Sequence, residues 1–273
     1  MDARMRSALF VPATRPERFL KALAAGADTV IVDLEDSVER DAKQQARENI
    51  AQFAAANAGV RFWVRLNGVT TSWYAEDLAL CGRFDNIVGI LLPKAESAAQ
   101  IVQTLSAGKP VIPIIESSKG VLALSEIAAV KGVERLSFGS LDLMLQLGTV
   151  PDTLGAGLLL NHLRCQILLH GSANGLAAPL DGVYPNFDDE AGLAALAQQI
   201  RDMGFGGMLC IHPKQIAPIH AAFAPTASEA DWAGRVLAIA NETGSSAFKV
   251  DGKMVDLPVI ERARQIVNSL GAA

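Results

Sequence analysis

The chain contains few cysteines, three in 273 residues. They are Cys81, Cys165 and Cys210, which lie far apart in the sequence. An odd, scattered set excludes a disulfide framework, and the absence of a Cys-x-x-Cys pair excludes a zinc ribbon. Reduced thiols are typical of the cytoplasm, where we expect this protein to reside.

Long hydrophobic runs and clusters of positive charge are also missing. No stretch approaches the ~18 consecutive apolar residues of a membrane span. The apolar residues 8–11 are too few for a signal peptide, and Pro12 follows them. The formal net charge is −5, the pI is near 5.4, and no Lys/Arg-rich block occurs. Because nucleic acids are bound through basic surfaces, we expect neither a membrane nor a nucleic acid as a partner.

The chain is rich in alternating segments of two kinds. Short runs of Val, Ile and Leu alternate with longer segments in which Ala and Leu recur at helical spacing. The predicted strands span residues 7–11, 29–33, 61–66, 88–92, 111–115, 135–138, 177–180 and 208–211. The predicted helices between and after them span residues 16–25, 41–57, 96–106, 122–130, 158–170, 190–203 and 213–223.

Eight strands, each followed by a helix or by a loop long enough to hold one, are typical of a (β/α)8 TIM barrel. The length of the chain also fits this α/β fold. An open, doubly wound sheet is the alternative. We favour the barrel because the repeats reach eight and no Gly-x-Gly-x-x-Gly motif follows the first strand.

The pattern changes after Phe223, so we divide the chain into a barrel domain, residues 1–225, and a C-terminal helical extension, residues 226–273. In the extension, Ser228 is the expected cap of a helix that runs to about Thr243. A hairpin around Asp251-Gly252 and a last helix over residues 258–270 follow. We expect this extension to form a lid, or an arm onto a neighbouring subunit.

Two acidic residues follow two consecutive predicted strands. Glu116 comes directly after residues 111–115, and Asp142 comes shortly after residues 135–138. The carboxyl ends of consecutive parallel strands lie side by side at the face where ligands bind. Two carboxylates there repel each other unless a cation lies between them, and Mg²⁺ suits such oxygen ligands. The alternative is that each acid caps the following helix, a contribution of ~0.3–1 kcal/mol; we favour the metal.

Arg65 ends the third predicted strand, so its guanidinium is expected at the same mouth. There it can grip a substrate carboxylate through two parallel hydrogen bonds. An ordinary ion pair with Asp33 or Glu35 is the alternative. Glu35 and Asp36 follow the second strand, where either could orient a metal-bound water or transfer a proton. A solvated loop that caps the next helix explains these two acids equally well.

Lys94 follows the fourth predicted strand. A buried lysine there could form a Schiff base, but beside two metal ligands we expect it to pair with Glu116 or another carboxylate. Arg15, Arg18 and Lys21 line the entry to the first helix, and Arg15 and Lys21 are candidates for contact with the phosphates of a large substrate. An exposed charged face is the alternative.

Seven short motifs are spread along the chain. They read Arg6-Ser7-Ala8-Leu9-Phe10-Val11-Pro12 with Pro16-Glu17-Arg18-Phe19, Asp33-Leu34-Glu35-Asp36-Ser37-Val38, Val64-Arg65-Leu66-Asn67, Leu92-Pro93-Lys94-Ala95-Glu96-Ser97, Ile114-Ile115-Glu116-Ser117, Phe138-Gly139-Ser140-Leu141-Asp142-Leu143 and Ile211-His212-Pro213-Lys214-Gln215-Ile216. In content and order they resemble the HpcH/HpaI aldolase/citrate lyase superfamily. The resemblance is to its citrate lyase β-subunit branch, which includes malyl-CoA and citramalyl-CoA lyases.

This resemblance implies a TIM barrel, a Mg²⁺ ion held by Glu116 and Asp142, and Arg65 gripping the oxo-acid end of the substrate. The CoA lyases of the family carry a Gly-Lys-Met-Ile-Asp-like segment that covers the site of a neighbouring subunit, and its aspartate handles a proton at the thioester carbon. The segment Gly252-Lys253-Met254-Val255-Asp256 matches. The resemblance therefore implies that Asp256 is catalytic and acts in trans, in a homotrimer or hexamer.

Two motifs depart from the common pattern of the family. Ser117-Ser118-Lys119-Gly120 stands where Thr-Ala-x-Gly is often found, and Gly139-Ser140-Leu141-Asp142 lacks the acid that often precedes the metal aspartate. Both departures leave the implied metal ligands intact. They bear on which acyl carrier and which oxo acid are used.

The expected activity is Mg²⁺-dependent cleavage of a 3-hydroxy-acyl thioester, of the citryl, citramalyl or malyl type, to a 2-oxo acid and an acyl thioester. The carrier is CoA or a carrier protein. The expected catalytic residues are Asp256, Arg65 and Glu35, and the expected substrate-binding residues are Arg65, Glu116, Arg15 and Lys21.

Three alternatives to this activity stand beside it. The first is the β subunit of a citrate lyase complex that acts on a carrier-protein thioester. The second is a free 2-oxo acid aldolase on the same barrel, which an early base histidine would favour; the first histidine here is His162. The third, a non-catalytic binding protein, is disfavoured because the metal and arginine positions are all occupied.

Overall fold

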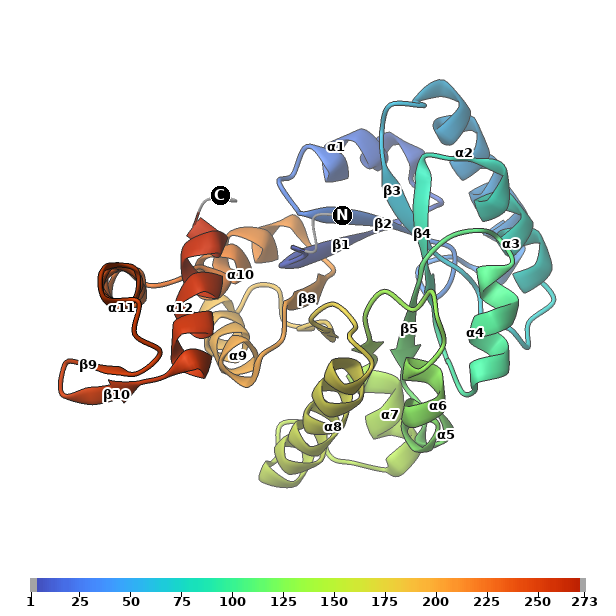
Figure 1. The fold of residues 1–273 in the computed structure, drawn as a ribbon. Coiled ribbons are helices and arrows are strands. Elements are labelled where there is room, and N and C mark those ends of the chain that lie inside the picture. Colours follow the sequence, from blue (N-terminus) through green and yellow to red (C-terminus); the bar gives the residue numbers. More distant parts are fainter. Residues whose placement is uncertain (1–3, 271–273) are drawn as a thin grey trace. The chain divides into compact units, whose positions relative to one another are not determined.

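A computed structural model describes residues 4–270 of the chain. Eight parallel strands close into a barrel in the order of the sequence (Figure 1). They are β1 (Ser7–Pro12), β2 (Thr29–Asp33), β3 (Phe62–Arg65), β4 (Ile87–Leu92), β5 (Val111–Ile115), β6 (Ser137–Phe138), β7 (Leu180–Asp181) and β8 (Gly207–Cys210). Pairing of β1 with β8, which sets Ser7 opposite Met208, completes the ring. The predicted TIM barrel is therefore confirmed, and the doubly wound sheet is excluded.

Helices surround this ring of strands (Figure 1). They are α1 (Phe19–Leu23), α2 (Lys43–Ala56), α3 (Tyr74–Arg83), α4 (Ala98–Leu105), α5 (Ser118–Leu122), α6 (Leu124–Ala128), α7 (Ser140–Leu147), α8 (Leu154–Ala173), α9 (Glu190–Met203) and α10 (Ile216–Phe223). Short 3-10 turns, η1 (Pro16–Arg18), η2 (Arg40–Ala42) and η3 (Pro213–Gln215), precede α1, α2 and α10.

Helices α3 and α7 are not predicted by the sequence pattern. In α7, Leu145 is 81% exposed and Leu147 is 46% exposed, so apolar residues lie on its outer face and obscure the helical period. The predicted helix 122–130 is also wrong in detail. A helix begins earlier, at Ser118, where the Ser117 hydroxyl accepts a hydrogen bond from the Gly120 amide at 3.1 Å, and it is interrupted at Ala123.

Apolar side chains fill the interior of the barrel. They belong to Met5, Ala8, Ile31, Trp63, Leu91, Ile112, Ile114, Leu180 and Leu209. The indole of Trp63 fits only because residue 89 is a glycine: a Cβ at Gly89 would lie 2.2 Å from Trp63 Cζ3. The barrel is thus a packed core and not a pore, and this leaves its mouth as the place for a ligand.

The chain divides into two compact units, Met1–Ala222 and Phe223–Ala273. The second unit contains α11 (Ala227–Thr243), the antiparallel hairpin of β9 (Phe248–Val250) and β10 (Lys253–Val255), and α12 (Leu257–Leu270). Its own core consists of Ala233, Val236, Val250, Val255, Ile260 and Ala263. The predicted hairpin and last helix are confirmed.

The cap of α11 differs from the expected one. The hydroxyl of Thr226 accepts a hydrogen bond from the Glu229 amide at 3.1 Å, and the Glu229 carboxylate accepts one from the Thr226 amide at 2.8 Å. This reciprocal pair satisfies two amides of the first turn at once. Thr226 therefore caps α11, and the prediction of Ser228 is wrong.

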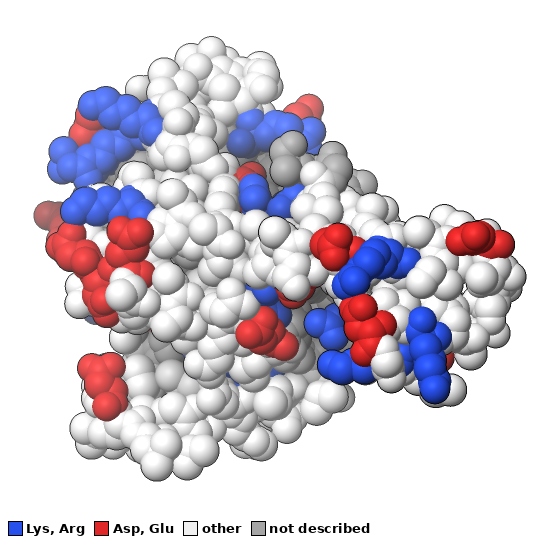
Figure 2. All heavy atoms as spheres, turned by 90° about the vertical axis from the view of Figure 1, so that its left-hand side faces the viewer, with Lys and Arg blue, Asp and Glu red and all other residues white. Residues whose placement is uncertain are grey.

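Figure 2 shows one face of the molecule, on which acidic and basic side chains stand in small mixed groups separated by broad uncharged areas. The described residues of that face form no continuous basic surface. Within residues 4–270, none of the helices has the length and apolar character that crossing a membrane requires.

Candidate active site

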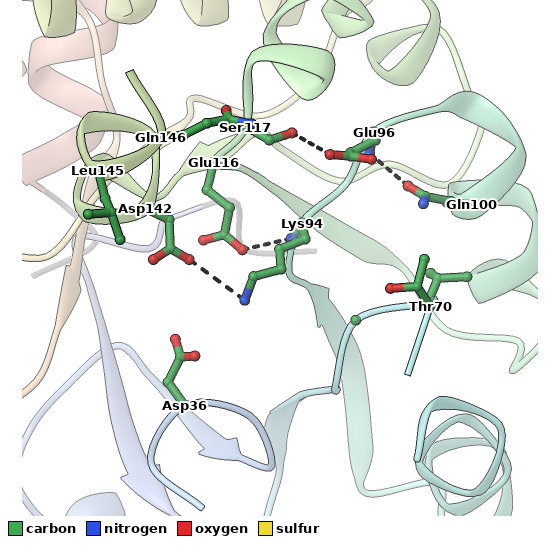
Figure 3. A pocket seen from close by; sticks show the side chains of 12 residues that line it. Asp36, Thr70, Lys94, Glu96, Gln100, Glu116, Ser117, Asp142, Leu145 and Gln146 are labelled. Atoms are coloured by element: carbon green, nitrogen blue, oxygen red, sulfur yellow. Dashed lines mark hydrogen bonds and ion pairs between the residues drawn. The ribbon is translucent and has the colours of Figure 1, made fainter. Parts of the chain in front are cut away.

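The carboxyl ends of β2 to β6 bring charged residues from distant parts of the chain to one mouth of the barrel. A cavity of about 430 Å³ opens there (Figure 3). It is lined by Asp36, Gly68, Val69, Thr70, Lys94, Glu96, Gln100, Glu116, Ser117, Asp142, Leu145 and Gln146. A smaller cavity of about 110 Å³ shares Asp36, Glu116 and Asp142 with it and is also lined by Arg65. The structure thus brings the predicted residues Arg65, Glu116 and Asp142 together.

Glu116 follows β5 directly and is buried, with 6% of its surface exposed. Its Oε1 accepts a hydrogen bond from the main-chain amide of Lys94 at 2.7 Å. Burial, followed by the negative charge of Glu35, raises the pKa of Glu116 to about 7. A carboxylate of this kind favours the approach of a cation, because a positive charge offsets the loss of hydration.

Gly139 makes room for the Glu116 carboxylate. A Cβ at position 139 would lie 2.4 Å from Glu116 Oε2 and 2.9 Å from its Cβ. Any side chain at this position would push the carboxylate away from the turn between β6 and α7. The glycine therefore belongs to the site, although the sequence motif alone does not reveal why.

Asp142 follows β6, as predicted, and lies within the first turn of α7. The reason is that β6 contains only Ser137 and Phe138, and the chain enters the helix directly after Gly139. The Asp142 side chain is 44% exposed and lines both cavities. A carboxylate in the first turn is also stabilised by the helix dipole, so the alternative of a helix-terminal acid fits Asp142; its role as a metal ligand stays a prediction.

Lys94 lies among the carboxylates of the mouth (Figure 3). Its Nζ is 2.5 Å from Glu35 Oε1 and 3.6 Å from Asp142 Oδ2. The prediction that Lys94 pairs with a carboxylate is confirmed; the ammonium pairs with Glu35 and Asp142, whereas Glu116 takes the main-chain amide. Burial opposes the charge, but the hydrogen bond with Glu35 and the negative charges of the surrounding carboxylates together outweigh it and raise the pKa of Lys94. An amine that stays protonated is a poor nucleophile, which disfavours the Schiff-base alternative.

Arg65 ends β3, and two of its nitrogens hold the carboxylate of Asp33. Nε donates to Oδ1 at 2.6 Å and Nη2 to Oδ2 at 2.8 Å. The remaining nitrogen, Nη1, lies 3.1 Å from Glu35 Oε2 and 3.2 Å from Asp36 Oδ2. The ion pair that the sequence left as an alternative is therefore present. A substrate carboxylate could bind Arg65 at Nη1, in place of Glu35 and Asp36.

Asp33 and Glu35 are two residues apart but differ in their preference for charge. Burial opposes ionisation of Asp33, but the charge and hydrogen bonds of Arg65, together with hydrogen bonds from Ser37 and the Glu35 amide, outweigh it and hold the pKa of Asp33 below its usual value. For Glu35, burial dominates and raises the pKa despite Arg65. Asp33 is thus a charged support for Arg65, whereas Glu35 is the better suited of the two to exchange a proton.

Two further buried residues support this mouth and are missed by the sequence reasoning. Lys43, on α2, donates from Nζ to the carbonyls of Leu34 and Glu35 at 2.6 and 2.7 Å. Asp77, on α3, accepts from the main-chain and side-chain amides of Asn67 at 3.0 and 2.6 Å. A lysine on the inner face of a predicted helix is a signal that could have revealed Lys43. Asp77 lies in a helix that the pattern does not predict.

Arg15 and Lys21 lie in the segment that follows β1, and both are exposed. Arg15 pairs with Glu17 at 2.7 Å. Neither residue lines either of the two cavities. Their contact with a substrate phosphate stays a prediction.

Asp256 belongs to the second unit and is exposed at the start of α12. Its carbonyl accepts a hydrogen bond from the Ile260 amide at 2.9 Å, and its Oδ1 accepts a longer one from the Val259 amide at 3.4 Å. Within this unit, Arg235 and Asp251 tie the hairpin to α11 at 2.9 Å. Asp256 is therefore held at the beginning of a helix, and its catalytic role stays a prediction.

The donors around the larger cavity suit a hard divalent cation. Glu116 and Asp142 supply carboxylate oxygens, and the ammonium of Lys94 beside them shows that positive charge is favourable at this place. Within residues 4–270, no three or more His, Cys, Asp and Glu side chains form a complete ligand cluster. Mg²⁺ is commonly bound by one or two carboxylates, and water and substrate oxygens fill its other coordination positions.

Comparison with known proteins shows which family has this sequence and fold. Residues 6–213 match the HpcH/HpaI aldolase/citrate lyase family. A citrate lyase subunit beta-like protein of Mycobacterium tuberculosis is 39% identical over 269 residues, which cover 97% of this chain and 95% of that protein. A (3S)-malyl-CoA thioesterase of Cereibacter sphaeroides is 38% identical over 271 residues, which cover 95% and 92% of the two chains.

A solved structure is similar to this chain over nearly its whole length. The crystal structure of the protein CitE from Mycobacterium tuberculosis, in complex with magnesium, acetoacetate and coenzyme A, has a TM-score of 0.87 and 36% sequence identity to this chain. The match covers 99% of this chain and 100% of that one. The resemblance drawn from the seven motifs is confirmed, and the chain belongs to the HpcH/HpaI aldolase/citrate lyase family, a family of lyase-type enzymes.

Proposed function

We propose that the chain is a Mg²⁺-dependent carbon–carbon lyase that cleaves a 3-hydroxy-acyl CoA thioester to a 2-oxo acid and an acyl-CoA. The observation that carries this proposal is the meeting of Glu116, Asp142 and Arg65 around the two cavities at the barrel mouth. Two carboxylates and a guanidinium are suited to a metal-chelated hydroxy acid. The relative that was solved with magnesium, an oxo acid and coenzyme A supports the same combination of ligands.

Glu116 and Asp142 would hold the Mg²⁺ ion. When bound, the ion supplies positive charge that eases deprotonation of the substrate hydroxyl and stabilises the developing carbonyl. Arg65 orients the carboxylate that becomes part of the 2-oxo acid, through the Nη1 edge that now faces Glu35 and Asp36. Asp33 fixes the other two nitrogens, so the guanidinium presents one defined edge.

Glu35 accepts the hydroxyl proton in this proposal, since burial raises its pKa and Lys43 holds its backbone in place. The carbon–carbon bond then breaks, and its electron pair moves onto the thioester as an enolate. Asp256 of another copy of the chain delivers a proton to the enolate carbon, which completes the acyl thioester. We assign Arg15 and Lys21 to the phosphates of CoA, because both follow the strand end of β1.

Hydrolysis of the thioester is a second candidate activity, because a relative of 38% identity is a malyl-CoA thioesterase. The same metal and arginine would bind the hydroxy acid, but a water would attack the thioester carbonyl. The two outcomes differ in products: cleavage gives a 2-oxo acid and an acyl-CoA, whereas hydrolysis gives a hydroxy acid and free CoA thiol.

We further propose that the enzyme works in the cytoplasm as a homotrimer or hexamer, with residues 226–273 as the lid. The alternative assemblies remain a citrate lyase complex with a carrier-protein thioester, and a free 2-oxo acid aldolase without a thioester. Native mass of the isolated chain, measured together with its activity, separates a self-sufficient homo-oligomer from a subunit that needs other chains.

The decisive experiment incubates the purified chain with Mg²⁺ and citryl-, citramalyl- or malyl-CoA, and measures 2-oxo acid and free thiol in parallel. We expect stoichiometric 2-oxo acid from one of the three, without thiol, and complete loss of product with EDTA. Thiol without oxo acid establishes the thioesterase. Neither product from any thioester, with turnover of a carrier-protein thioester instead, establishes the complex subunit and overturns the proposal.

A further inference from the structure

We propose that Lys94 is a built-in counter-cation of the carboxylate cluster, and that a divalent cation displaces its ammonium when it binds between Glu116 and Asp142. Lys94 thereby sets the affinity of the site for the metal. This inference rests on the proposed metal function. It adds that Lys94 competes with the metal for the carboxylates of Glu116 and Asp142. The charge of Lys94 keeps the carboxylates together before the metal arrives and lowers the metal affinity afterwards.

The first observation is the number of carboxylates that this one residue contacts. The main-chain amide of Lys94 donates to Glu116, and its Nζ lies 2.5 Å from Glu35 and 3.6 Å from Asp142. Both candidate metal ligands are therefore neighbours of the same residue. Figure 3 shows Lys94 with its backbone nitrogen beside the Glu116 carboxylate and its side-chain nitrogen directed towards Asp142.

The second observation is the backbone of Lys94. Its φ is +51°, in the left-handed region that residues other than glycine adopt rarely. This conformation directs the amide to Glu116 Oε1 at 2.7 Å while the side chain turns back towards Asp142. Strained conformations persist where the surrounding structure determines them, often at functional sites. The amide contact belongs to the main chain, so it can remain when the ammonium moves.

The third observation is the balance of charge. Asp36, Glu35, Glu116 and Asp142 gather at the mouth, and Arg65 commits two of its nitrogens to Asp33. Arg65 Nη1 still reaches Glu35 and Asp36, so removal of Lys94 would mainly leave Glu116 and Asp142 without their neighbouring ammonium. With a divalent cation bound, an ammonium at its present position would repel that cation. The two cations thus exclude each other.

The fourth observation is room for the ammonium to move. The Lys94 side chain is 49% exposed and lines the cavity of about 430 Å³. Gly68 lines the same cavity, and a Cβ built there would be 4.0 Å from Lys94 Cδ, at ordinary contact distance. The exposed half of the side chain and the open cavity give Nζ space to leave Asp142, and in this proposal its bond with Glu35 is kept.

The test is Mg²⁺ titration calorimetry on the full chain, for wild type, Lys94→Met, Lys94→Gln and Lys94→Arg. We expect Lys94→Met and Lys94→Gln to bind Mg²⁺ on the order of tenfold more tightly than wild type, because the competing charge is gone. Lys94→Arg keeps the charge and should stay within about threefold of wild type. Lys119→Met is the matched control: Lys119 is exposed on α5 and lines neither cavity, so its affinity should be unchanged.

Thermal unfolding supplies a second readout that does not depend on turnover. Metal-free Lys94→Met should melt below wild type, and saturating Mg²⁺ should raise its melting temperature more than it raises that of wild type. Equal or weaker Mg²⁺ affinity in both neutral variants overturns the inference while leaving the proposed function intact. If neither wild type nor any variant binds Mg²⁺, the metal function itself fails. If Lys94→Met and Lys94→Gln bind Mg²⁺ and wild type does not, the inference is supported.

Discussion

Arg65 and Asp33 form a two-point ion pair that joins the ends of β3 and β2. Arg65 Nε and Nη2 lie 2.6 and 2.8 Å from the two oxygens of Asp33, which is 1% exposed. The same two strands also pair residue by residue, with Asp33 opposite Arg65. The register of the sheet therefore places Asp33 beside the guanidinium that we propose binds the substrate.

Asp33→Asn should impair substrate binding and stability together. The variant loses the charge that fixes Arg65 and leaves the guanidinium with weaker partners, which costs about 3 kcal/mol in the free energy of unfolding. We expect kcat/KM to fall by ~10–100-fold, mainly through KM, because the orientation of Arg65 is loosened. Urea denaturation and steady-state kinetics measure the two effects. Unchanged KM in a destabilised protein would show that the pair is structural only.

Asp142→Ala should abolish cleavage and leave the fold intact. The side chain is half exposed in the first turn of α7, so its loss removes a proposed metal ligand and no core contact. We expect kcat to fall by at least ~10³-fold and the far-UV circular dichroism to match wild type. Full activity of this variant, or of wild type in EDTA, would contradict the metal mechanism.

Gly139→Ala should displace the Glu116 carboxylate. The added Cβ would meet Glu116 Oε2 at 2.4 Å, so we expect a loss of ~1–3 kcal/mol in the free energy of unfolding and weaker Mg²⁺ binding. Gly234→Ala is the control, because a Cβ there meets nothing within 4 Å and Gly234 is exposed in the middle of α11. The control should be neutral or stabilised by up to ~1 kcal/mol. Chemical denaturation and calorimetry measure both quantities.

The pH dependence of stability should carry the signature of Glu116. Burial and the charge of Glu35 raise its pKa from the ordinary 4.5 to about 7, so between these pH values the folded protein keeps a proton that the unfolded chain has lost. The metal-free protein should therefore lose stability as the pH rises from 4.5 to 7, by at most about 3 kcal/mol from this group. Urea denaturation in EDTA measures the slope. Glu116→Gln should flatten it; an identical slope in both proteins would rule out Glu116 as the source.

Asp256→Asn should reduce kcat by ~10²–10⁴-fold as expected of a general acid, while the free energy of unfolding stays within about 0.5 kcal/mol of wild type. Asparagine can replace aspartate at the start of α12 without loss of the turn. Asp251→Asn, on the hairpin and paired with Arg235, is the matched control and should keep full activity.

Mixed oligomers test whether Asp256 acts in trans. An inactive Asp142→Ala chain and an inactive Asp256→Asn chain, unfolded and refolded together, should regain a measurable fraction of wild-type activity, because some sites then combine two intact halves. No recovery from a mixture shown by native mass spectrometry to contain both chains would place Asp256 in the site of its own chain, or outside the reaction.

Much of the barrel could be read from the sequence because each strand is a local apolar run. The predicted runs 29–33 and 111–115 coincide with β2 and β5 as observed. The short strand β6 and the helix α7 were harder, since apolar residues continue from the core onto the exposed face of α7 at Leu145. The predicted strand 135–138 is therefore longer than β6, and the helix that carries Asp142 is not predicted.

The sequence by itself determined which charged residues gather at the mouth, because the carboxyl end of each parallel strand must lie on one face. It also determined the family, through motifs whose order is preserved. Only the tertiary structure decided how those charges pair: Asp33 takes Arg65, and Lys94 reaches Glu35 across 59 positions of the chain. Electrostatic energy depends on separations of a few ångströms, and such separations are set by the packing of the whole barrel and not by local sequence.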